Sequence, residues 1–330
     1  MTRPSLRPVV WTPPSIPDRA RRADSGVPLP PLRIIELNGT GPEDVVVDAE
    51  RRILTGVDDG RILRISPDGR TIETIADTGG RPLGLELHPD GGLVVCDARR
   101  GLLHVDRGDI RTLVDASDLR FCNNAAVAAN GTIYFSDSSR RFGLEHWRAD
   151  ILEHSGTGRL FRREPDGRVE QLLDGLQFAN GVALAADESF VAVAQTGAYA
   201  VTRLWLTGDR AGTTDELVPN LPGFPDNIAL GEDDLIWITI ASPRNPLVDR
   251  LAPLPPVLRQ AVWALPEQLQ PAPAHTVWVL AVDADGRVVH DLQGTCERFH
   301  MVTGVRQRGS EVFLGSLIGR TIGVLTLPSL

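Results

Sequence analysis

Apolar and polar residues alternate in short stretches along most of the chain, and one such stretch recurs six times. Each copy consists of an apolar strand pattern, a polar turn and a second apolar strand pattern. The copies align without a gap on Glu43, Leu83, Asn123, Asn180, Asp226 and Thr303, and ten residues later each has a large apolar residue: Ile53, Leu93, Ile133, Phe190, Ile236 and Phe313. Turns such as HPDGG at 88–92 and AANGT at 128–132 suit tight hairpins. The pattern therefore predicts six repeated β-hairpins.

A second series of turns falls between later strand patterns, with SPDGR at 66–70, EPDGR at 164–168 and DADGR at 283–287. Each repeat thus supplies about four short antiparallel strands, and six such units arranged radially form an all-β, six-bladed β-propeller. The segment LRIIELN at 32–38 precedes the first copy, while the last copy ends at Leu330 one strand short. We expect this N-terminal strand to complete the last blade and close a propeller of residues 32–330. Residues 1–31, rich in proline, are then a tail on its surface.

Two connections between the second and third strands of a blade are long, at 138–157 and 241–275. The second places Leu251, Leu254, Leu258 and Val262 at helical spacing, beside Trp263. One interpretation is a solvated excursion with one short helix packed on the rim. The other is an apolar lid over a site, since long loops in compact domains often cover active sites. Because both connections fall on the face where the innermost strands begin, we favour the lid.

The six aligned residues begin the innermost strands, so they form a ring around the mouth of the central channel. Asparagine and acidic residues are disfavoured in strands, yet Glu43, Asn123, Asn180 and Asp226 occupy four of these positions. Each alone is more often a turn or capping residue. Together, two carboxylates and two carboxamides on one axis suit a hard cation such as Ca²⁺, which binds oxygen ligands at about 2.3–2.6 Å.

Several short motifs resemble the strictosidine-synthase-like branch of the calcium-dependent phosphotriesterase superfamily. They are GPED (41–44), GRPLGL (80–85), FCNN (121–124), LQFANGVAL (176–184), PGFPDNI (222–228) and VFLGSL (312–317). The chain is similar to adipocyte plasma membrane-associated proteins and, more distantly, to paraoxonases and the gluconolactonase/regucalcin group. The resemblance implies a catalytic calcium that supports hydrolysis of lactones, aryl esters or organophosphates. It also implies that Glu43, Asn123, Asn180 and Asp226 are the ligands, with Asn227 as an additional one.

Three positions depart from the families that the chain resembles. Leu83 stands where paraoxonases have a histidine proposed as general base, and Thr303 where strictosidine synthases have their basic glutamate. Asn124 stands where many hydrolytic relatives have an aspartate. We therefore expect Asp226 to act as base or nucleophile as well as ligand. His300, three residues before Thr303, is a second catalytic candidate, because a histidine titrates near neutral pH.

Composition narrows the classes of function. A net charge of −9 offers no basic surface for nucleic acid or anionic lipid. The chain has no lysine, which excludes a lysine Schiff base, and no apolar run of membrane-spanning length. We expect a cytoplasmic protein without nucleic-acid or membrane partners. A calcium-dependent hydrolase of apolar esters or lactones is favoured. The alternatives are a binding or scaffold propeller with structural calcium and a strictosidine-synthase-type condensing enzyme, against which Thr303 argues.

Overall fold

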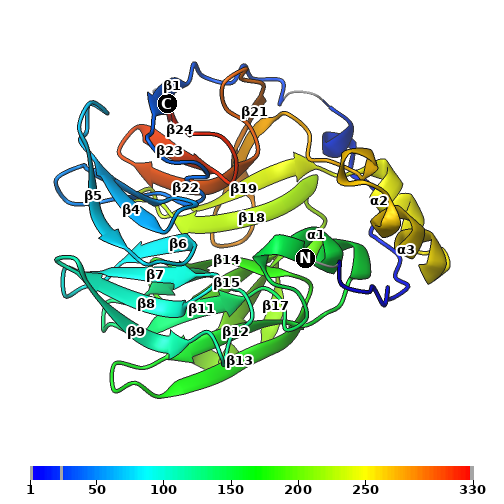
Figure 1. Cartoon of the computed structure of the whole chain (residues 1–330), viewed down its shortest axis with the longest axis horizontal. Helices are drawn as coiled ribbons and strands as arrows, with labels where there is room; N and C mark the ends of the chain where they lie inside the picture. Colours follow the sequence, from blue (N-terminus) through cyan, green and yellow to red (C-terminus); the bar gives the residue numbers. More distant parts are fainter. Residues whose placement is uncertain (1–2, 23–24, 328–330) are drawn as a thin grey trace.

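The alternating segments form strands that associate as six four-stranded antiparallel sheets around a common axis (Figure 1). The computed structural model describes residues 3–22 and 25–327. Residues 1–2 and 23–24 of the predicted tail, and 328–330 of the predicted propeller, lie outside the described residues. The predicted six-bladed propeller is confirmed.

The strands follow the repeat in chain order. The first sheet contains β2 (Val46–Val47), β3 (Ile53–Gly56), β4 (Arg61–Ile65) and β5 (Ile72–Asp77), and the second β6 (Pro82–Leu87), β7 (Leu93–Asp97), β8 (Gly101–Asp106) and β9 (Asp109–Asp115). The third contains β10 (Cys122–Val127), β11 (Ile133–Asp137), β12 (Gly158–Arg163) and β13 (Val169–Leu176), and the fourth β14 (Ala179–Leu184), β15 (Phe190–Gln195), β16 (Ala200–Trp205) and β17 (Thr214–Val218). The fifth contains β18 (Gly223–Leu230), β19 (Ile236–Pro243), β20 (Val277–Val282) and β21 (Val288–Gly294), and the sixth β22 (Val302–Arg308), β23 (Glu311–Ser316) and β24 (Thr321–Thr326).

The outermost strand of the sixth sheet comes from the other end of the chain. Strand β1 (Arg33–Glu36) pairs antiparallel with β24, with Arg33 opposite Val324 and Glu36 opposite Thr321. Since β24 would otherwise present an unpaired edge, this pairing both completes the blade and joins the two ends of the ring. The predicted closure by residues 32–38 is confirmed.

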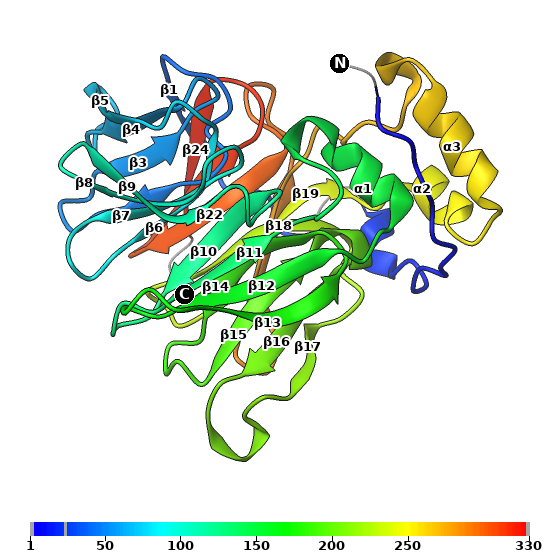
Figure 2. The same cartoon turned by 60° about the horizontal axis from the view of Figure 1, so that its bottom comes forward.

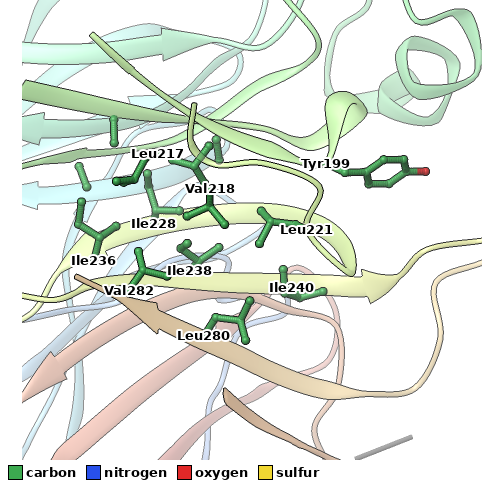
Figure 3. Close-up of a cluster of buried hydrophobic side chains, with 14 of the residues drawn as sticks. Tyr199, Leu217, Val218, Leu221, Ile228, Ile236, Ile238, Ile240, Leu280 and Val282 are labelled. Atoms are coloured by element: carbon green, nitrogen blue, oxygen red, sulfur yellow. The ribbon is translucent and has the colours of Figure 1, made fainter. Parts of the chain in front are cut away.

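The hydrophobic core lies between neighbouring blades rather than at one centre. Figure 3 shows the cluster between the fourth and fifth sheets, in which Ile228, Ile238 and Leu280 face Val218. Side chains on successive strand residues point to opposite faces, so each buried strand contributes to the clusters on both of its sides. This explains why the second strand of each blade reads as a continuous apolar run, such as Phe190–Gln195.

Helices occur mainly in the two long connections. The connection 138–157 contains η2 (Leu144–His146) and α1 (Trp147–Glu153), and 241–275 contains α2 (Pro246–Leu251), α3 (Pro256–Ala264) and η5 (Glu267–Leu269). Shorter turns are η1 (Asp18–Arg21), η3 (Thr196–Ala198) and η4 (Gly208–Arg210). Both views place α1, α2 and α3 together on one side of the propeller (Figures 1 and 2).

The connection 241–275 contains two helices rather than the one short helix of the solvated-excursion interpretation. Prolines at 253, 255 and 256 divide the segment into α2 and α3, because proline cannot continue a helix from its interior. Leu254 and Leu258 are exposed. The buried residue of α3 is Arg259, which donates to the carbonyls of Leu152 (3.0 Å) and Val9 (2.7 Å).

The N-terminal segment, residues 3–22, forms a strap across the helices of both connections (Figure 2). The amide of Val9 donates to the carbonyl of Glu153 at 2.8 Å, and the Trp11 ring stacks on His154 with a centroid separation of 3.9 Å. Arg244 donates to the carbonyl of Pro14 at 2.8 Å. Further along, the Arg19 guanidinium pairs with Asp291 in the fifth blade. The strap therefore links the end of α1 to the second connection and to the propeller.

Within the described parts of the chain, every helix is too short or too polar to cross a membrane.

Candidate functional site

Five of the six ring residues lie at irregularities in the innermost strands, and Glu43 precedes the short strand β2. The ladder between the first two strands of a blade skips from Cys122 to Ala125, from Ala179 to Val182 and from Pro225 to Ile228. The same skip occurs between Pro82 and Leu85 and between Val302 and Val305. Two residues are left unpaired each time, as in a β-bulge, which redirects side chains away from the sheet faces. This explains how a strand accommodates the adjacent residues Asn123 and Asn124.

The residue that follows each ring residue is either polar or glycine, in strict alternation around the ring. Asp44, Asn124 and Asn227 alternate with Gly84, Gly181 and Gly304. A Cβ at Gly84 would lie 2.6 Å from Cα of Asn124, and one at Gly181 would lie 2.5 Å from Cα of Asn227. The glycines therefore let neighbouring innermost strands approach closely around the axis.

Four of the ring residues converge on one pocket. Glu43, Asn123, Asn180 and Asp226 all line a cavity of about 110 Å³ at the mouth of the channel. Among the described residues, Oε2 of Glu43 and Oδ1 of Asn123 and Asn180 are buried without a hydrogen-bond partner. Buried polar atoms are normally satisfied, so three unpartnered oxygens facing one cavity need an explanation.

Asn227 lies beside this group rather than on the pocket wall. Its Nδ2 donates to Oε1 of Glu43 at 3.0 Å, and its Oδ1 is likewise buried without a partner. The structure thus brings all five residues proposed as calcium ligands together, four on the pocket and Asn227 against Glu43.

Two hydroxyl groups that sequence reasoning missed orient the asparagine side chains. Nδ2 of Asn123 donates to Oγ of Ser138 at 2.9 Å, and Nδ2 of Asn180 donates to Oγ1 of Thr196 at 3.1 Å. Because each amide nitrogen is engaged in this way, the amide oxygen is the atom left without a partner. Ser138 and Thr196 follow the second strands of their blades, so extending the repeat alignment by a few residues would have found them.

The carboxylates at the mouth destabilise one another's charged forms. Burial raises the pKa of Glu43 well above its usual range, the neighbouring Asp226 and Asp44 raise it further, and Arg81 opposes the rise. Burial also raises the pKa of Asp226 to about 7, although a hydrogen bond from Asn180 opposes this. A bound cation would reverse both effects, because an opposite charge within a few ångströms favours the ionised carboxylate.

Unpartnered carboxylate and amide oxygens, with no sulfur and no imidazole among them, are the donor set of a hard cation such as calcium. The residues present therefore fit the metal that the family resemblance implies.

An apolar wall surrounds the oxygen ring, and much of it comes from a position that the repeat alignment did not highlight. Phe121, Phe178, Phe224 and Met301 each precede a ring residue by two positions, and all of them line the pocket. The rings of Phe121 and Phe178 meet edge to face at 5.5 Å. Phe178 and Met301 have left-handed backbone angles, with φ of 59° and 54°. This backbone conformation is uncommon in residues other than glycine and turns both side chains toward the pocket.

Both long connections contribute to the same pocket. From 138–157 come Leu144, Trp147 and Ile151, while 241–275 supplies Val248 and the run Gln270, Pro271, Ala272 and Pro273. Trp263 does not line it and packs instead with the cluster of Leu6, Phe142, Ala149 and Leu152. Helix α3 thus lies on the outside, and the wall of the second connection comes from its two ends.

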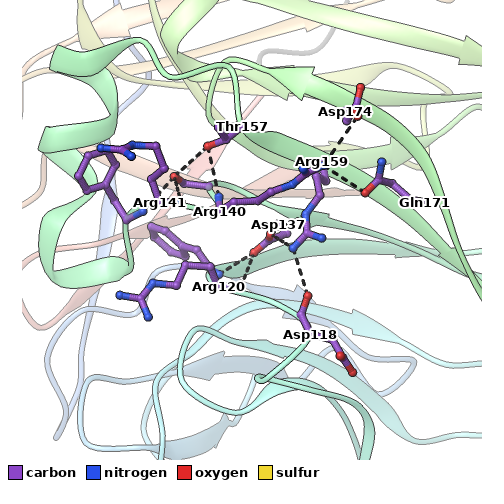
Figure 4. Close-up of polar contacts among 12 residues, drawn as sticks. Asp118, Arg120, Asp137, Arg140, Arg141, Thr157, Arg159, Gln171 and Asp174 are labelled. Atoms are coloured by element: carbon purple, nitrogen blue, oxygen red, sulfur yellow. Dashed lines mark hydrogen bonds and ion pairs between the residues drawn. The ribbon is translucent and has the colours of Figure 1, made fainter. Parts of the chain in front are cut away.

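A buried ion pair anchors the first connection next to the ring. Oδ1 of Asp137 accepts hydrogen bonds from the amides of Arg120 (3.0 Å) and Phe121 (2.6 Å), and Oδ2 accepts from the Arg159 guanidinium at 2.6 Å (Figure 4). Asp137 and Arg159 flank the connection 138–157, and Arg120 directly precedes the wall residue Phe121. One carboxylate therefore fixes both ends of the connection and the entry to β10.

The structure does not bring His300 to the pocket. Its ring stacks on His275 at 3.9 Å, its carbonyl accepts from Oγ of Ser316, and it is absent from the described residues that line the cavity. The neighbouring Met301 lines the pocket instead. The two residues are adjacent on an irregular entry to β22, where the left-handed backbone of Met301 directs consecutive side chains differently. The prediction that His300 reaches the mouth is therefore wrong.

The three departures have distinct surroundings. Leu83 lines the pocket as part of the apolar wall. Thr303 is buried and donates to the carbonyl of Glu43 at 2.7 Å. Asn124 lies deeper, with Nδ2 donating to Asp44 at 3.2 Å and Oδ1 accepting from the amide of Val182 at 2.9 Å. Asn124 thus links the third blade to the first and the fourth.

Comparisons with known proteins agree with this architecture. Residues 123–209 match the family model described as strictosidine synthase, and residues 29–65 match the strictosidine synthase-like N-terminal model. The adipocyte plasma membrane-associated protein of Rattus norvegicus is 31% identical over 90% of this chain and 86% of its own. Protein strictosidine synthase-like 6 of Arabidopsis thaliana is 31% identical over 84% and 76%.

Solved structures share the fold. A gluconolactonase from Xanthomonas campestris superposes with a TM-score of 0.65, covering 99% of both chains at 20% identity. A regucalcin from Agrobacterium tumefaciens, titled a calcium-binding protein, gives a TM-score of 0.60 over 88% of this chain and 94% of its own at 13% identity. With its ring, its blade order and these sequence relatives, the chain belongs to the strictosidine-synthase-like family of β-propellers.

Proposed function

We propose that this protein is a calcium-dependent hydrolase of compact apolar esters or lactones. The observation that carries the proposal is the set of buried oxygens of Glu43, Asn123 and Asn180, unpartnered and directed at one apolar pocket that also contains Asp226. These four residues would hold the metal, with Asn227 supporting Glu43. When bound, calcium would supply Lewis acidity toward a scissile carbonyl.

The chain's own residues supply the remaining functions. Asp226 is partly exposed in the pocket, whereas Glu43 is buried. A carboxylate oxygen of Asp226 is therefore the proton acceptor for an attacking water, a role typically worth about 10²–10⁴-fold in rate. The covering residues Leu144, Trp147 and Val248 exclude bulk water from the ester.

The pocket wall suggests the substrate class. A cavity of about 110 Å³ is of the same order as the roughly 150 Å³ apolar cavity that binds benzene, so it suits a phenyl ring or a small lactone. Its aromatic and aliphatic lining offers few hydrogen bonds, which a sugar lactone with several hydroxyl groups would require. We therefore expect aryl esters and alkyl lactones to be better substrates than gluconolactone.

A binding propeller is the second candidate, and one observation favours it. No histidine is among the described residues that line the pocket, so general acid assistance from imidazole is missing. In that case the same oxygen ring would hold calcium only as a structural ion, and the apolar pocket would bind a ligand without turnover.

The test is a panel of phenyl acetate, a γ-lactone, gluconolactone and paraoxon, assayed with calcium and after removal of calcium with EDTA. Turnover should depend on calcium, and Asp226→Ala and Glu43→Ala should abolish both turnover and calcium binding by calorimetry. Asp174→Ala, which changes an exposed carboxylate in the third blade, is the matched control and should behave as wild type.

Calcium binding without turnover on any panel member would support the binding propeller. Turnover that survives complete calcium removal would contradict the proposed mechanism, and full calcium affinity in Asp226→Ala would show that the ring is not the metal site.

A further inference from the structure

A group of metal-ligating side chains lies in the second blade, away from the pocket. His88 and Asp90 belong to the turn between β6 and β7, and His104 lies on β8. Leu83 at the mouth begins β6 and His88 follows its end, so the group sits about 17 Å away, at the opposite face of the propeller. We propose that these three side chains form a binding site for a divalent transition metal ion, of which Zn²⁺ is the best match.

The distances suit one small ion. Oδ1 of Asp90 lies 2.8 Å from Nδ1 of His88 and 3.2 Å from Nε2 of His104. The three potential ligand atoms all lie within 4.8 Å of one another. Ligands at about 2.0–2.1 Å in a tetrahedral zinc site are separated from one another by about 3.3 Å. The separation of His104 from Asp90 already matches this value, and the separation of His88 from Asp90 would widen by about 0.5 Å. Small side-chain shifts would therefore bring the three atoms onto a common ion, leaving a fourth position for water.

The group is held in place by its surroundings. Oδ1 of Asp90 also accepts from the amide of Gly92 at 2.9 Å, which fixes the carboxylate within its turn. The His104 side chain is 9% exposed and that of His88 is 19% exposed, while Asp90 is open to solvent. A Cβ at Gly92 would lie 2.5 Å from Nε2 of His104, so the glycine leaves room for the ring. The two imidazoles are preorganised, and an ion can enter past Asp90.

Hydrogen bonding alone leaves a conflict at His88. Its Nδ1 faces the carboxylate of Asp90, an acceptor, and also lies 3.4 Å from the amide of Asp90, a donor. One ring nitrogen cannot donate and accept at once. If Nδ1 is unprotonated and accepts from the amide, its lone pair faces the carboxylate at 2.8 Å. A metal ion bound between Nδ1 and the carboxylate replaces this repulsion with attraction, because both atoms then donate electron pairs to the ion.

The donor set also selects the ion. Two imidazole nitrogens and one carboxylate oxygen suit Zn²⁺ and its transition-metal neighbours, whereas Ca²⁺ prefers oxygen ligands alone. The site is therefore distinct in chemistry and position from the oxygen ring at the mouth, and it does not depend on the proposed hydrolase activity.

The experiment is calorimetric titration of EDTA-treated and desalted full-length protein with ZnCl₂ in excess CaCl₂. Wild type should bind one zinc ion at this site. The same titration of Glu43→Gln shows whether any further zinc binds at the channel mouth, because that variant loses a ligand there but none in the second blade. His88→Ala and His104→Ala should each weaken zinc binding by at least about tenfold, since even changes behind metal ligands cost 10–100-fold. His275→Ala, which alters an exposed histidine outside the group, should bind zinc as wild type does.

Two gentler variants decide the question if His104→Ala fails to fold. Asp90→Asn keeps an acceptor for the Gly92 amide but loses the ligand charge, and Gly92→Ala displaces the His104 ring while retaining all three ligands. Both should weaken zinc binding and reduce the zinc-dependent rise in Tm. Absence of zinc binding in wild type, or unchanged affinity in both His104→Ala and Asp90→Asn, would overturn the proposal, as would equal loss in His275→Ala.

Discussion

Asp150 shows at the residue scale how burial makes stability depend on pH. Its carboxylate lies on α1, accepts from Oγ of Ser155 at 2.9 Å and also bonds Ser139. Burial raises its pKa from 3.8 to about 6, despite these hydrogen bonds. The folded protein thus holds a proton more tightly than the unfolded chain. The resulting stabilisation is complete below pH 3.8 and is lost as pH rises through about 6.

We therefore expect Asp150→Asn to gain stability relative to wild type as the pH rises from about 4 to about 7, by at most about 3 kcal/mol. Urea unfolding of the two proteins across this range measures the difference. Wild type must be compared with Asp150→Asn at each pH, because His154 titrates in the same range and changes the free energy of unfolding in the opposite direction. Burial and Arg259 lower its pKa from 6.5 to about 4, so its contribution is lost as pH falls. A constant difference between the two proteins would contradict the role of Asp150.

The hydrogen-bond partners of Asn124 indicate a structural role for this residue. Asn124 stands where hydrolytic families that the chain resembles have an aspartate, and its side chain bonds Asp44 and the amide of Val182. Asn124→Asp would remove the donor to Asp44 and place two carboxylates about 3 Å apart, where both cannot easily be ionised.

In EDTA at neutral pH, we expect Asn124→Asp to lower the free energy of unfolding by about 1–3 kcal/mol. With calcium present, its turnover on the ester panel should not exceed that of wild type. Thermal unfolding and the ester panel together test this expectation. Asn130→Asp, which changes an exposed turn residue of the same blade, is the control. Increased calcium-dependent turnover in Asn124→Asp would show instead that a carboxylate at this position assists catalysis.

At the element scale, the strap of residues 3–22 explains how the two connections remain over the pocket. Helices α1 and α3 are each fewer than ten residues long, too short to be stable alone in water. Arg259 on α3 donates to the carbonyl of Leu152 on α1 and to that of Val9 in the strap. The stack of Trp11 on His154 covers the end of α1. The strap therefore stabilises the cover from outside.

Trp11→Ala should loosen the cover while leaving the propeller intact. We expect faster amide exchange in 144–154 and 246–264, with local opening made easier by about 1–3 kcal/mol, and unchanged calcium affinity. Hydrogen exchange monitored by mass spectrometry measures this, with Val10→Ala as an exposed control on the same segment. Faster exchange throughout the blades, rather than in the cover, would show that the strap supports the whole fold.

At the scale of the whole molecule, closure of the ring depends on a single strand pairing between its two ends. Strand β1 covers the edge of β24 and packs Ile35 into the buried cluster shared by the first and last blades. Without it, an unpaired edge would face solvent next to exposed apolar surface, a combination that favours aggregation.

Two truncations distinguish the role of β1 in closing the ring from the role of the strap in holding the cover. Deletion of residues 1–22 should yield a soluble, cooperatively unfolding propeller, whereas deletion of residues 1–37 should give a chain that aggregates or unfolds without a sharp transition. Size-exclusion chromatography and calorimetry distinguish these outcomes. A monomeric protein with a sharp transition after the longer deletion would show that β1 is dispensable for closure.

Much of the fold could be predicted from the order of residues alone. The sixfold repeat, the hairpin turns and the orphan strand at 32–38 are local patterns with period two, and each blade is built from consecutive segments. The same alignment placed Glu43, Asn123, Asn180 and Asp226 at equivalent positions, because every innermost strand begins at the same face.

Only the tertiary structure decided which side chains from distant segments contact one another. His300 and Met301 are neighbours in sequence, yet backbone geometry sends only Met301 to the pocket. The interaction of the strap with α1 and α3, and the partners of Asn124 on other blades, join residues tens to hundreds of positions apart. Local periodicity carries no information on such contacts, since they depend on how complete blades pack around the axis. The sequence alone determined the blades and their ring, and the packing of the blades determined what each ring residue touches.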